Sequence, residues 1–357
     1  MGGDEFIVTL TELNEISRVD ALAQNILHEL AEPFRLENEV VYLSASIGIT
    51  LYPHDATAVE ELIKNADQAM YAAKNAGRNR FSYFTQSMQQ TAQARLRLAN
   101  ELRGALDASQ FMVYYQPIME LATGRIHKAE ALIRWQHPVR GFVSPADFIP
   151  LAEETGLIVE IGNWVFGEAA HQTKRCRALF DQEFQISVNM SPIQFQGTGS
   201  PCQAWPVYLQ ELGIPGQSLV IEITEGLLLK EETGVKDKLL RFHGAGVQIS
   251  LDDFGTGYSS LSYLQKFDID YLKIDQSFTR GLEPGSKNMA LSEAIIVMAH
   301  KLGMQVIAEG VETEAQRTLL AAAGCDCGQG YLFSRPVPAE KFEELLKGAL
   351  TGGYQAQ

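Results

Sequence analysis

Carboxylates, amides and a lysine stand at the ends of successive apolar runs in the last two thirds of the chain. In chain order they are Glu130, Asn189, Glu222 with Glu225, Asp252 with Asp253, Lys273 with Asp275, and Glu309, while Gln329 opens the last run. Any one of these residues alone is compatible with a helix cap, a turn or a solvated rim position. Five successive strand ends that carry oxygen ligands are harder to explain in this way. That many acids in one mouth repel one another unless cations neutralise them, so the set predicts a metal site.

The kinds of side chain narrow the chemistry of this predicted site. They are hard oxygen donors, and the seven histidines show no metal-ligand spacing, which favours Mg²⁺ or Mn²⁺ over Zn²⁺. The adjacent Asp252 and Asp253 could serve two ions, with one carboxylate bridging them. A two-ion site stabilises both the attacking and the leaving oxygen in phosphoester hydrolysis, and Lys273 could orient the attacking water or offset transition-state charge.

The elements that must position these residues are strands alternating with helices. Strand-like runs occur at "FMVYYQPIM", "GRIHKAEALIRW", "FQISVNMS", "SLVIEITE", "VQISLDDFG", "IDYLKIDQS", "QVIAEGVE" and "GYLFSRP", and helical patterns separate most of them. Eight strands over about 240 residues predict an α/β fold, a (β/α)₈ TIM-type barrel whose mouth gathers the strand ends. The first two runs follow one another without a clear helix, which predicts an irregular start, and an open doubly wound sheet is the alternative.

The residues before the predicted barrel have a different organisation. The opening "GGDEF", at residues 2–6, predicts a tight turn that presents two carboxylates, and "FIVTL" and "VVYLSASIGITLYP" predict strands among helices up to about residue 84. Leu98, Leu102 and Leu106 share one helical face, which predicts a linker helix. The expected organisation is a partial α/β domain at 1–86, a linker helix at 87–108, a barrel at 109–350 and a flexible tail at 351–357.

Composition and charge exclude several classes of function. With 46% hydrophobic and 20% charged residues, the 357-residue chain has a globular composition. A formal net charge of −15 opposes sequence-independent binding to DNA or to an anionic membrane surface. No run approaches the length of a membrane span, no basic and apolar leader opens the chain, and four cysteines form no disulfide framework, so a cytoplasmic location is expected.

Seven motifs, in order, resemble those of the EAL-domain cyclic di-GMP phosphodiesterases. They are "EALIRW", "NMS", "EITE", "DDFGTGYSSL", "LKID", "AEGVE" and "GQGYLFSRP", and the likeness runs from about residue 111 to residue 350. The resemblance implies a barrel with an antiparallel first strand and hydrolysis of cyclic di-GMP to linear pGpG in bacterial second-messenger signalling. It also implies two Mg²⁺ or Mn²⁺ ions, inhibition by Ca²⁺, and a homodimer formed through the barrel.

The resemblance also implies a role for each matching residue. The first metal ion would be held by Glu130, Asn189, Glu222 and Asp252, and a second by Asp252, Asp253 and, directly or through water, Glu309. Lys273 matches the residue that contacts the catalytic water, and Gln329 a glutamine of the same site, so Lys273, Asp253, Glu309 and Gln329 are the predicted catalytic residues. Glu225 matches an acid that orders the "DFGTG" loop, and Gln116, Leu132 and Arg134 match positions that contact the dinucleotide.

The first segment resembles the GGDEF diguanylate cyclases through "GGDEF", "SIGIT" and "ADQAMYAAKNAGRNRF". The likeness covers only the C-terminal half of such a domain, which implies that this segment is incomplete and inactive. Two alternatives to the hydrolase stay open: a silent receptor that binds cyclic di-GMP and relays a conformational change, and, as the weakest, a cyclase that makes cyclic di-GMP from GTP.

Overall fold

The computed structural model describes residues 4–11, 16–36, 39–195, 201–229, 234–255, 264 and 266–350. The chain divides into two compact units, Met1–Asn100 and Glu101–Gln357. The predicted tail at 351–357, the first two residues of "GGDEF" and most of the loop that follows Gly255 lie outside the described residues.

The first unit is a small α/β arrangement around a short parallel pair of strands. Its elements are α1 (Ser17–Ala31), β1 (Phe34–Leu36), β2 (Glu39–Val41), β3 (Ser46–Ile49), α2 (Val59–Asn75), β4 (Arg80–Tyr83) and most of α3 (Gln86–Arg103). β3 and β4 pair in parallel and β1 and β2 pair antiparallel. Val19 and Ala23 of α1 pack on Ile49, and the Tyr83 hydroxyl donates to Asp20 Oδ1 over 2.7 Å.

Two strand predictions in this unit are wrong. Residues 6–10, "FIVTL", form no strand, and Phe6 is 86% exposed. A short apolar run becomes a strand only when a neighbouring strand supplies hydrogen bonds, and no strand within the described residues pairs with residues 6–10. The single strand predicted for "VVYLSASIGITLYP" is divided between β2 and β3, with residues 42–45 irregular between them.

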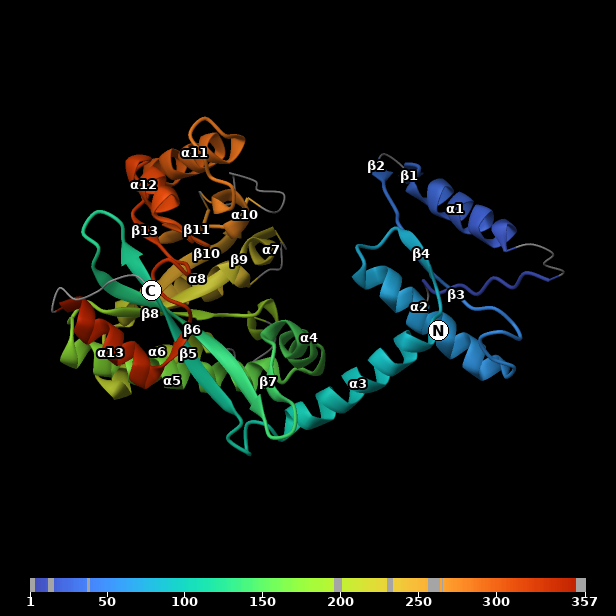
Figure 1. Cartoon of the computed structure of the whole chain (residues 1–357), viewed down its shortest axis with the longest axis horizontal. Helices are drawn as coiled ribbons and strands as arrows, with labels where there is room; N and C mark the ends of the chain where they lie inside the picture. The colour runs from blue at the N-terminus through green and yellow to red at the C-terminus, as the bar shows by residue number, and fades with distance from the viewer. Residues whose placement is uncertain are drawn as a thin grey trace. The chain divides into compact units, whose positions relative to one another are not determined.

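The second unit is a closed eight-stranded barrel (Figure 1). Its strands are β5 (Phe111–Glu120), β6 (Ile126–His137), β8 (Gln185–Asn189), β9 (Leu219–Thr224), β10 (Gln248–Phe254), β11 (Tyr271–Ile274), β12 (Gln305–Ala308) and β13 (Cys327–Gly328). Neighbours from β6 through β8 to β13 pair in parallel, whereas β5 pairs antiparallel with both β6 and β13 and closes the ring. The predicted barrel and its antiparallel first strand are therefore confirmed.

Two short strands extend the sheet beyond the ring, and helices cover its outside. β7 (Gly141–Val143) pairs with β6, and β14 (Val337–Pro338) pairs with β5. The larger helices are α4 (Pro145–Thr155), α5 (Ile158–Leu179), α6 (Pro201–Leu212), α8 (Val235–Gly244), α11 (Lys287–Lys301), α12 (Glu314–Ala322) and α13 (Ala339–Leu350). The short elements are η1 (Pro192–Phe195), η2 (Gly216–Ser218), α7 (Glu225–Leu229) and α10 (Gln276–Thr279). No helix within the described residues is long and apolar enough to cross a membrane.

The barrel interior is polar at its floor, defined here as the amino ends of the parallel strands. The Tyr271 hydroxyl donates to Gln185 Oε1 and Gln248 Oε1, each over 3.1 Å. Lys128 Nζ lies 3.8 Å from the centroid of the Tyr271 ring, a cation–π contact. Burial lowers the pKa of Lys128 to about 8.

The last barrel strand lies earlier in the sequence than predicted. "GYLFSRP" forms turns, and the strand is the two-residue β13 just before it. Gln329 therefore follows the carboxyl end of a strand, where its backbone N–H donates to the Ala308 carbonyl over 2.8 Å. Gly330 allows this packing, because a Cβ on it would lie 2.1 Å from the Val311 carbonyl oxygen.

Gly330→Ala is expected to destabilise the barrel by about 2 kcal/mol, because the added methyl group must displace the Val311 backbone. Urea denaturation monitored by circular dichroism measures this loss. The matched control is Gly348→Ala in α13, where an added Cβ meets nothing within 4 Å and stability is expected to stay equal or rise slightly. Equal stability of Gly330→Ala and the wild type would contradict the packing argument.

Candidate active site

A buried lysine lies at the centre of the barrel mouth. Lys273, on β11, is 0% exposed. Its Nζ lies 2.7 Å from Glu222 Oε2 of β9 and 2.7 Å from Glu309 Oε1, which directly follows β12. It lies 3.3 Å from Asp252 Oδ1 of β10 and 3.4 Å from Glu130 Oε2 of β6. One ammonium group is thus shared by four carboxylates from four different strands.

Amide side chains hold the carboxylate of Glu130 from its other sides. Asn189 Nδ2 donates to Glu130 Oε1 over 2.6 Å, and Gln329 Nε2 donates to Glu130 Oε2 over 2.7 Å. The same Gln329 nitrogen donates to Gln116 Oε1 over 3.0 Å, and Gln116 Nε2 donates to the Ser334 carbonyl over 3.1 Å. These bonds fix the position of Glu130 in relation to Lys273.

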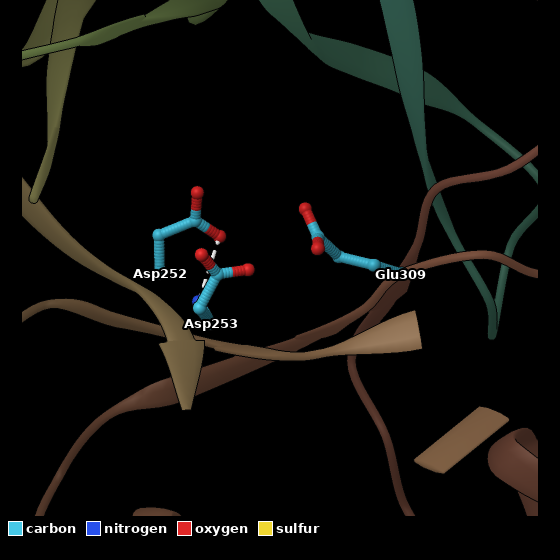
Figure 2. Close-up of side chains that lie close together, drawn as sticks. All are labelled: Asp252, Asp253 and Glu309. Atoms are coloured by element: carbon cyan, nitrogen blue, oxygen red, sulfur yellow. Dashed lines mark hydrogen bonds between the residues drawn. The ribbon is translucent and has the colours of Figure 1, made fainter. Parts of the chain in front are cut away.

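A backbone irregularity brings two successive aspartates to the same side of the strand. Side chains normally alternate between the two faces of a strand, but the β10–β11 register shifts between Leu251 and Phe254. Asp253 has a φ of 56°, in the left-handed region, and its N–H donates to Asp252 Oδ1 over 3.0 Å. One carboxylate oxygen from each of Asp252, Asp253 and Glu309 lies within 4.8 Å of the other two, and the three side chains lie close together in Figure 2.

The crowding of charges sets the pKa values at the mouth. Burial lowers the pKa of Lys273, but the surrounding carboxylates, Glu130 and Glu222 foremost, raise it further, so it lies well above the usual range. Burial and the neighbouring Glu130 raise the pKa of Glu222, and burial raises the pKa of Glu309 to about 7. Burial also raises the pKa of Glu130, but Lys273 and the amide hydrogen bonds outweigh it and leave that pKa below the usual range.

The residues predicted to contact a dinucleotide lie along β5 and β6. Glu130, Leu132 and Arg134 alternate along β6 and so share a face. Gln116 of β5 is directly opposite Glu130. Gln116 itself is buried.

Aromatic side chains that the sequence analysis did not single out accompany them. Arg134 Cζ lies 5.4 Å from the ring centroid of Tyr114, whose ring is T-shaped against Phe142 at 6.1 Å. Arg335 Cζ lies 4.1 Å from the ring centroid of Tyr331, just beyond β13. Tyr114 lies opposite Leu132 in the antiparallel pairing of β5 with β6, a register that the sequence alone does not give.

Two other strand-end acids have different surroundings. Asp275 is the N-cap of α10, where its side chain accepts from the Ser277 N–H over 2.9 Å, which matches the cap alternative for a strand-end acid. Glu225 is buried at the first residue of α7, three positions after Glu222. The loop that Glu225 was predicted to order lies mostly outside the described residues.

The donor set fits a hard divalent cation. Asp252, Asp253 and Glu309 offer carboxylate oxygens at mutual distances that one or two ions span. Glu130 and Glu222 lie next to this group, because both contact Lys273. Asn189 joins the group through its hydrogen bond to Glu130. Mg²⁺ and Mn²⁺ prefer such oxygen ligands. Of the predicted residues, the structure brings together Glu130, Asn189, Glu222, Asp252, Asp253, Lys273, Glu309, Gln329 and Gln116.

Fold and site together define a class of protein: a TIM-type barrel with one antiparallel strand and an acidic, lysine-centred site at the carboxyl ends of its strands. The family model of the EAL domain matches residues 99–336 of this chain. The family model of the diguanylate cyclase GGDEF domain matches residues 1–80. The chain belongs to the EAL-domain family, and the predicted resemblance to both families is confirmed.

Named relatives extend this assignment. The chain is 40% identical over 341 residues to the bifunctional diguanylate cyclase/cyclic di-GMP phosphodiesterase MucR of Pseudomonas aeruginosa, covering 96% of this chain and 50% of MucR. It is 39% identical over 348 residues to the cyclic di-GMP phosphodiesterase PdeR of Escherichia coli, covering 97% of this chain and 52% of PdeR. The chain thus spans about half the length of these curated relatives.

A solved structure gives a similar result. The structure titled "PaMucR Phosphodiesterase, c-di-GMP complex" matches with a TM-score of 0.66 and 39% identity, covering 69% of this chain and 99% of that one. The match shows that the barrel architecture described above is the one adopted by this relative.

Glu309→Gln is expected to stabilise the metal-free protein at pH 8 by on the order of 3 kcal/mol, because each unit of pKa shift corresponds to about 1.4 kcal/mol. The folded state holds the Glu309 proton up to a pKa of about 7, so the wild type loses stability as pH rises from about 4.5 to 7. At pH 5 most of the gain should be lost, because little of the window between the two pKa values lies below this pH. Urea denaturation in chelator measures both values.

The control for this prediction is Glu312→Gln. Glu312 is exposed and lies three residues further along the chain, so the same change of charge should leave stability unaltered at both pH values. A Glu309→Gln variant that is less stable than the wild type at pH 8 would show that its ion pair with Lys273 outweighs burial.

Proposed function

We propose that this chain is a phosphodiesterase that hydrolyses one phosphodiester bond of cyclic di-GMP and releases linear pGpG. The observation that carries the proposal is the cluster of four carboxylates around Lys273, with Asp253 beside Asp252 and Glu309. Relatives named as cyclic di-GMP phosphodiesterases, at about 40% identity over nearly the whole chain, support the choice of substrate. We assign the activity to residues 109–350, acting in the cytoplasm.

Two Mg²⁺ or Mn²⁺ ions would be held by the acids of the mouth. Glu130, Asn189, Glu222 and Asp252 form one ligand set, and Asp252, Asp253 and Glu309 form the other. Bound there, the ions would polarise the phosphoryl group and neutralise charge on the attacking and leaving oxygens. Ca²⁺ should bind without supporting turnover, because it takes more ligands at longer distances than Mg²⁺ does.

The chain's own residues supply orientation and charge. Lys273 Nζ can donate a hydrogen bond to the attacking water and offset negative charge that develops at the phosphorus. Gln329 and Asn189 keep Glu130 in place through their amide N–H groups. Arg134, on the same strand face as Leu132, is available to the phosphate or base of the dinucleotide, and Gln116 lies at the inner end of that wall.

Lys273→Met is expected to lower kcat for cyclic di-GMP by about 10³-fold, because it removes a preorganised cation from a water-excluded site. The measurement is chromatographic detection of pGpG with Mg²⁺, Mn²⁺ or Ca²⁺ present. Glu314→Gln, an exposed acid in the first turn of α12, is the control and should retain full activity. Saturable binding of cyclic di-GMP with no pGpG in any metal would identify the chain as a receptor instead.

We also propose that the active form is a homodimer that uses the outer face of α11. Met289 and Ile296 of this helix face the core, whereas Leu291 and Val297 are 48% and 56% exposed. Both side chains lie on the solvent side of α11, and exposed apolar side chains gathered on one element are found at protein–protein interfaces.

Leu291→Glu combined with Val297→Glu should therefore convert the dimer to a monomer in light scattering, since charge at the centre of an interface opposes association. Leu240→Glu on α8, at a residue 46% exposed, is the control and should leave the dimer intact. A wild type that is monomeric at micromolar concentration would contradict the proposal.

A further inference from the structure

The short helix α10, Gln276–Thr279, contacts the backbone on both sides of the group of acids at the mouth. The ring of its Phe278 lies against Gly255, where an added Cβ would lie 2.8 Å from the ring. Gly255 comes two residues after Asp253 and has a φ of 96°, so a side chain there would be both strained and blocked. The backbone that carries Asp253 therefore packs closely on α10.

The same helix contacts the backbone that carries Glu309. Gly310 follows Glu309 with a φ of 66°, and a Cβ on it would lie 2.6 Å from Gln276 Cβ and 3.1 Å from Thr279 Oγ1. Only glycine allows an approach this close. α10 is thus packed against both of the chain segments that supply the three acids lying within 4.8 Å of one another.

A hydrogen bond from α10 fixes the backbone of Glu309. The Glu309 N–H donates to the Ile274 carbonyl of β11 over 3.0 Å, which continues the strand pairing by one residue beyond β12. The Glu309 carbonyl accepts from Thr279 Oγ1 over 2.5 Å. Thr279 is 0% exposed, and a hydroxyl has one proton to donate, for which the Gln276 carbonyl at 3.0 Å is the more distant acceptor. Both backbone polar groups of Glu309 are therefore bound.

Two outer helices hold α10 in this position. Asn288 Nδ2, in the first turn of α11, donates to the carbonyls of Ser277 and Arg280 over 3.1 and 2.9 Å. Gln316 Nε2 of α12 donates to the Thr279 carbonyl over 3.0 Å. The last carbonyls of a helix have no partner within the helix, so these amides satisfy them and fix α10 from outside.

We propose that α10 sets the distance between Glu309 and the two neighbouring aspartates, and that Thr279 is the positioning residue through which it acts on Glu309. Asn288 supports Thr279 by fixing the helix from α11. The inference rests on the proposed function, in which Asp252, Asp253 and Glu309 are metal ligands. This role requires no contact between Thr279 and the substrate.

The position of Glu309 matters because small divalent cations tolerate little variation in their ligands. Mg²⁺ requires ligands at about 2.0–2.1 Å in near-octahedral geometry. A shift of the Glu309 backbone would change the place of its carboxylate relative to the two aspartates and to Lys273 Nζ, which lies 2.7 Å from it. Residues that orient metal ligands from outside the ligand set typically contribute about 10–100-fold to metal affinity.

Mn²⁺ titration of the full chain without substrate, followed by electron paramagnetic resonance, tests the role of Thr279. Thr279→Val removes the hydroxyl at nearly constant shape and is expected to weaken Mn²⁺ binding about 10-fold. Thr279→Ser keeps the hydroxyl and should bind Mn²⁺ within about two-fold of the wild type.

The matched control is Thr173→Val on α5. Thr173 is also 0% exposed, and its hydroxyl donates to the Ala169 carbonyl over 2.7 Å, a bond that involves no residue of the site. This variant should lose about as much stability in urea as Thr279→Val does, because each loses one buried hydrogen bond. Its Mn²⁺ affinity should nevertheless equal that of the wild type.

Asn288→Ala tests the support from α11 in the same titration. It removes both hydrogen bonds to α10 and is expected to weaken Mn²⁺ binding several-fold, whereas Asn100→Ala, at an exposed asparagine of α3, should not. In Thr279→Val and Asn288→Ala the Mn²⁺ concentration for half-maximal activity should rise, while kcat at saturating Mn²⁺ stays within about two-fold of the wild type.

The outcomes separate this inference from the proposed function. A wild type that binds Mn²⁺ no more tightly than Thr279→Val would overturn the role of Thr279, as would an equal loss in Thr173→Val or in Thr279→Ser. A wild type that binds no Mn²⁺ at all would overturn the proposed ligand set, and this inference with it. If the wild type binds Mn²⁺ but forms no pGpG, the proposed activity is wrong and the binding data still decide the role of α10.

Discussion

The structure of the barrel mouth depends on the shared ion pair of Lys273. A buried ammonium is tolerated only where opposite charges surround it, and four buried or half-buried carboxylates are tolerated only where a cation lies among them. Since Lys273 Nζ reaches Glu222 and Glu309 at 2.7 Å and Asp252 and Glu130 at 3.3–3.4 Å, displacement of any of four strands disturbs all of these contacts. The contacts of Lys273 therefore connect strands of the closed ring and also arrange the side chains of the site.

Departures from regular barrel geometry occur next to the side chains that surround Lys273. The irregularity at Asp253 aligns two successive carboxylates, and the two-residue β13 ends early enough for Gln329 to reach Glu130. Antiparallel pairing of β5 with β6 places Gln116 opposite Glu130, where Gln116 accepts a hydrogen bond from the Gln329 amide that also holds Glu130. Regular alternation of side chains alone would provide none of these three arrangements.

The sequence predicted the barrel because buried parallel strands are apolar runs with polar residues only at their ends, as around Glu222 and Lys273. It could not locate β13, since two residues carry no periodicity, nor foresee that "FIVTL" is no strand, since strands need partners. Lys128 and Tyr271 also escaped prediction, because their contact joins strands far apart in sequence across the barrel interior. Likewise, Asp252 and Asp253 looked like a simple pair, and only backbone geometry shows how both reach one side.

Two walls of the barrel mouth are built by different strands, and this has a consequence for how the site can evolve. The aromatic and cationic wall, with Tyr114, Leu132 and Arg134, comes from β5 and β6, whereas the carboxylates beside Lys273 come mainly from β9 to β12. A single substitution on β10 or after β12 would remove an acid without touching the first wall. The acids of the later strands and the wall from β5 and β6 can therefore change independently of one another in evolution.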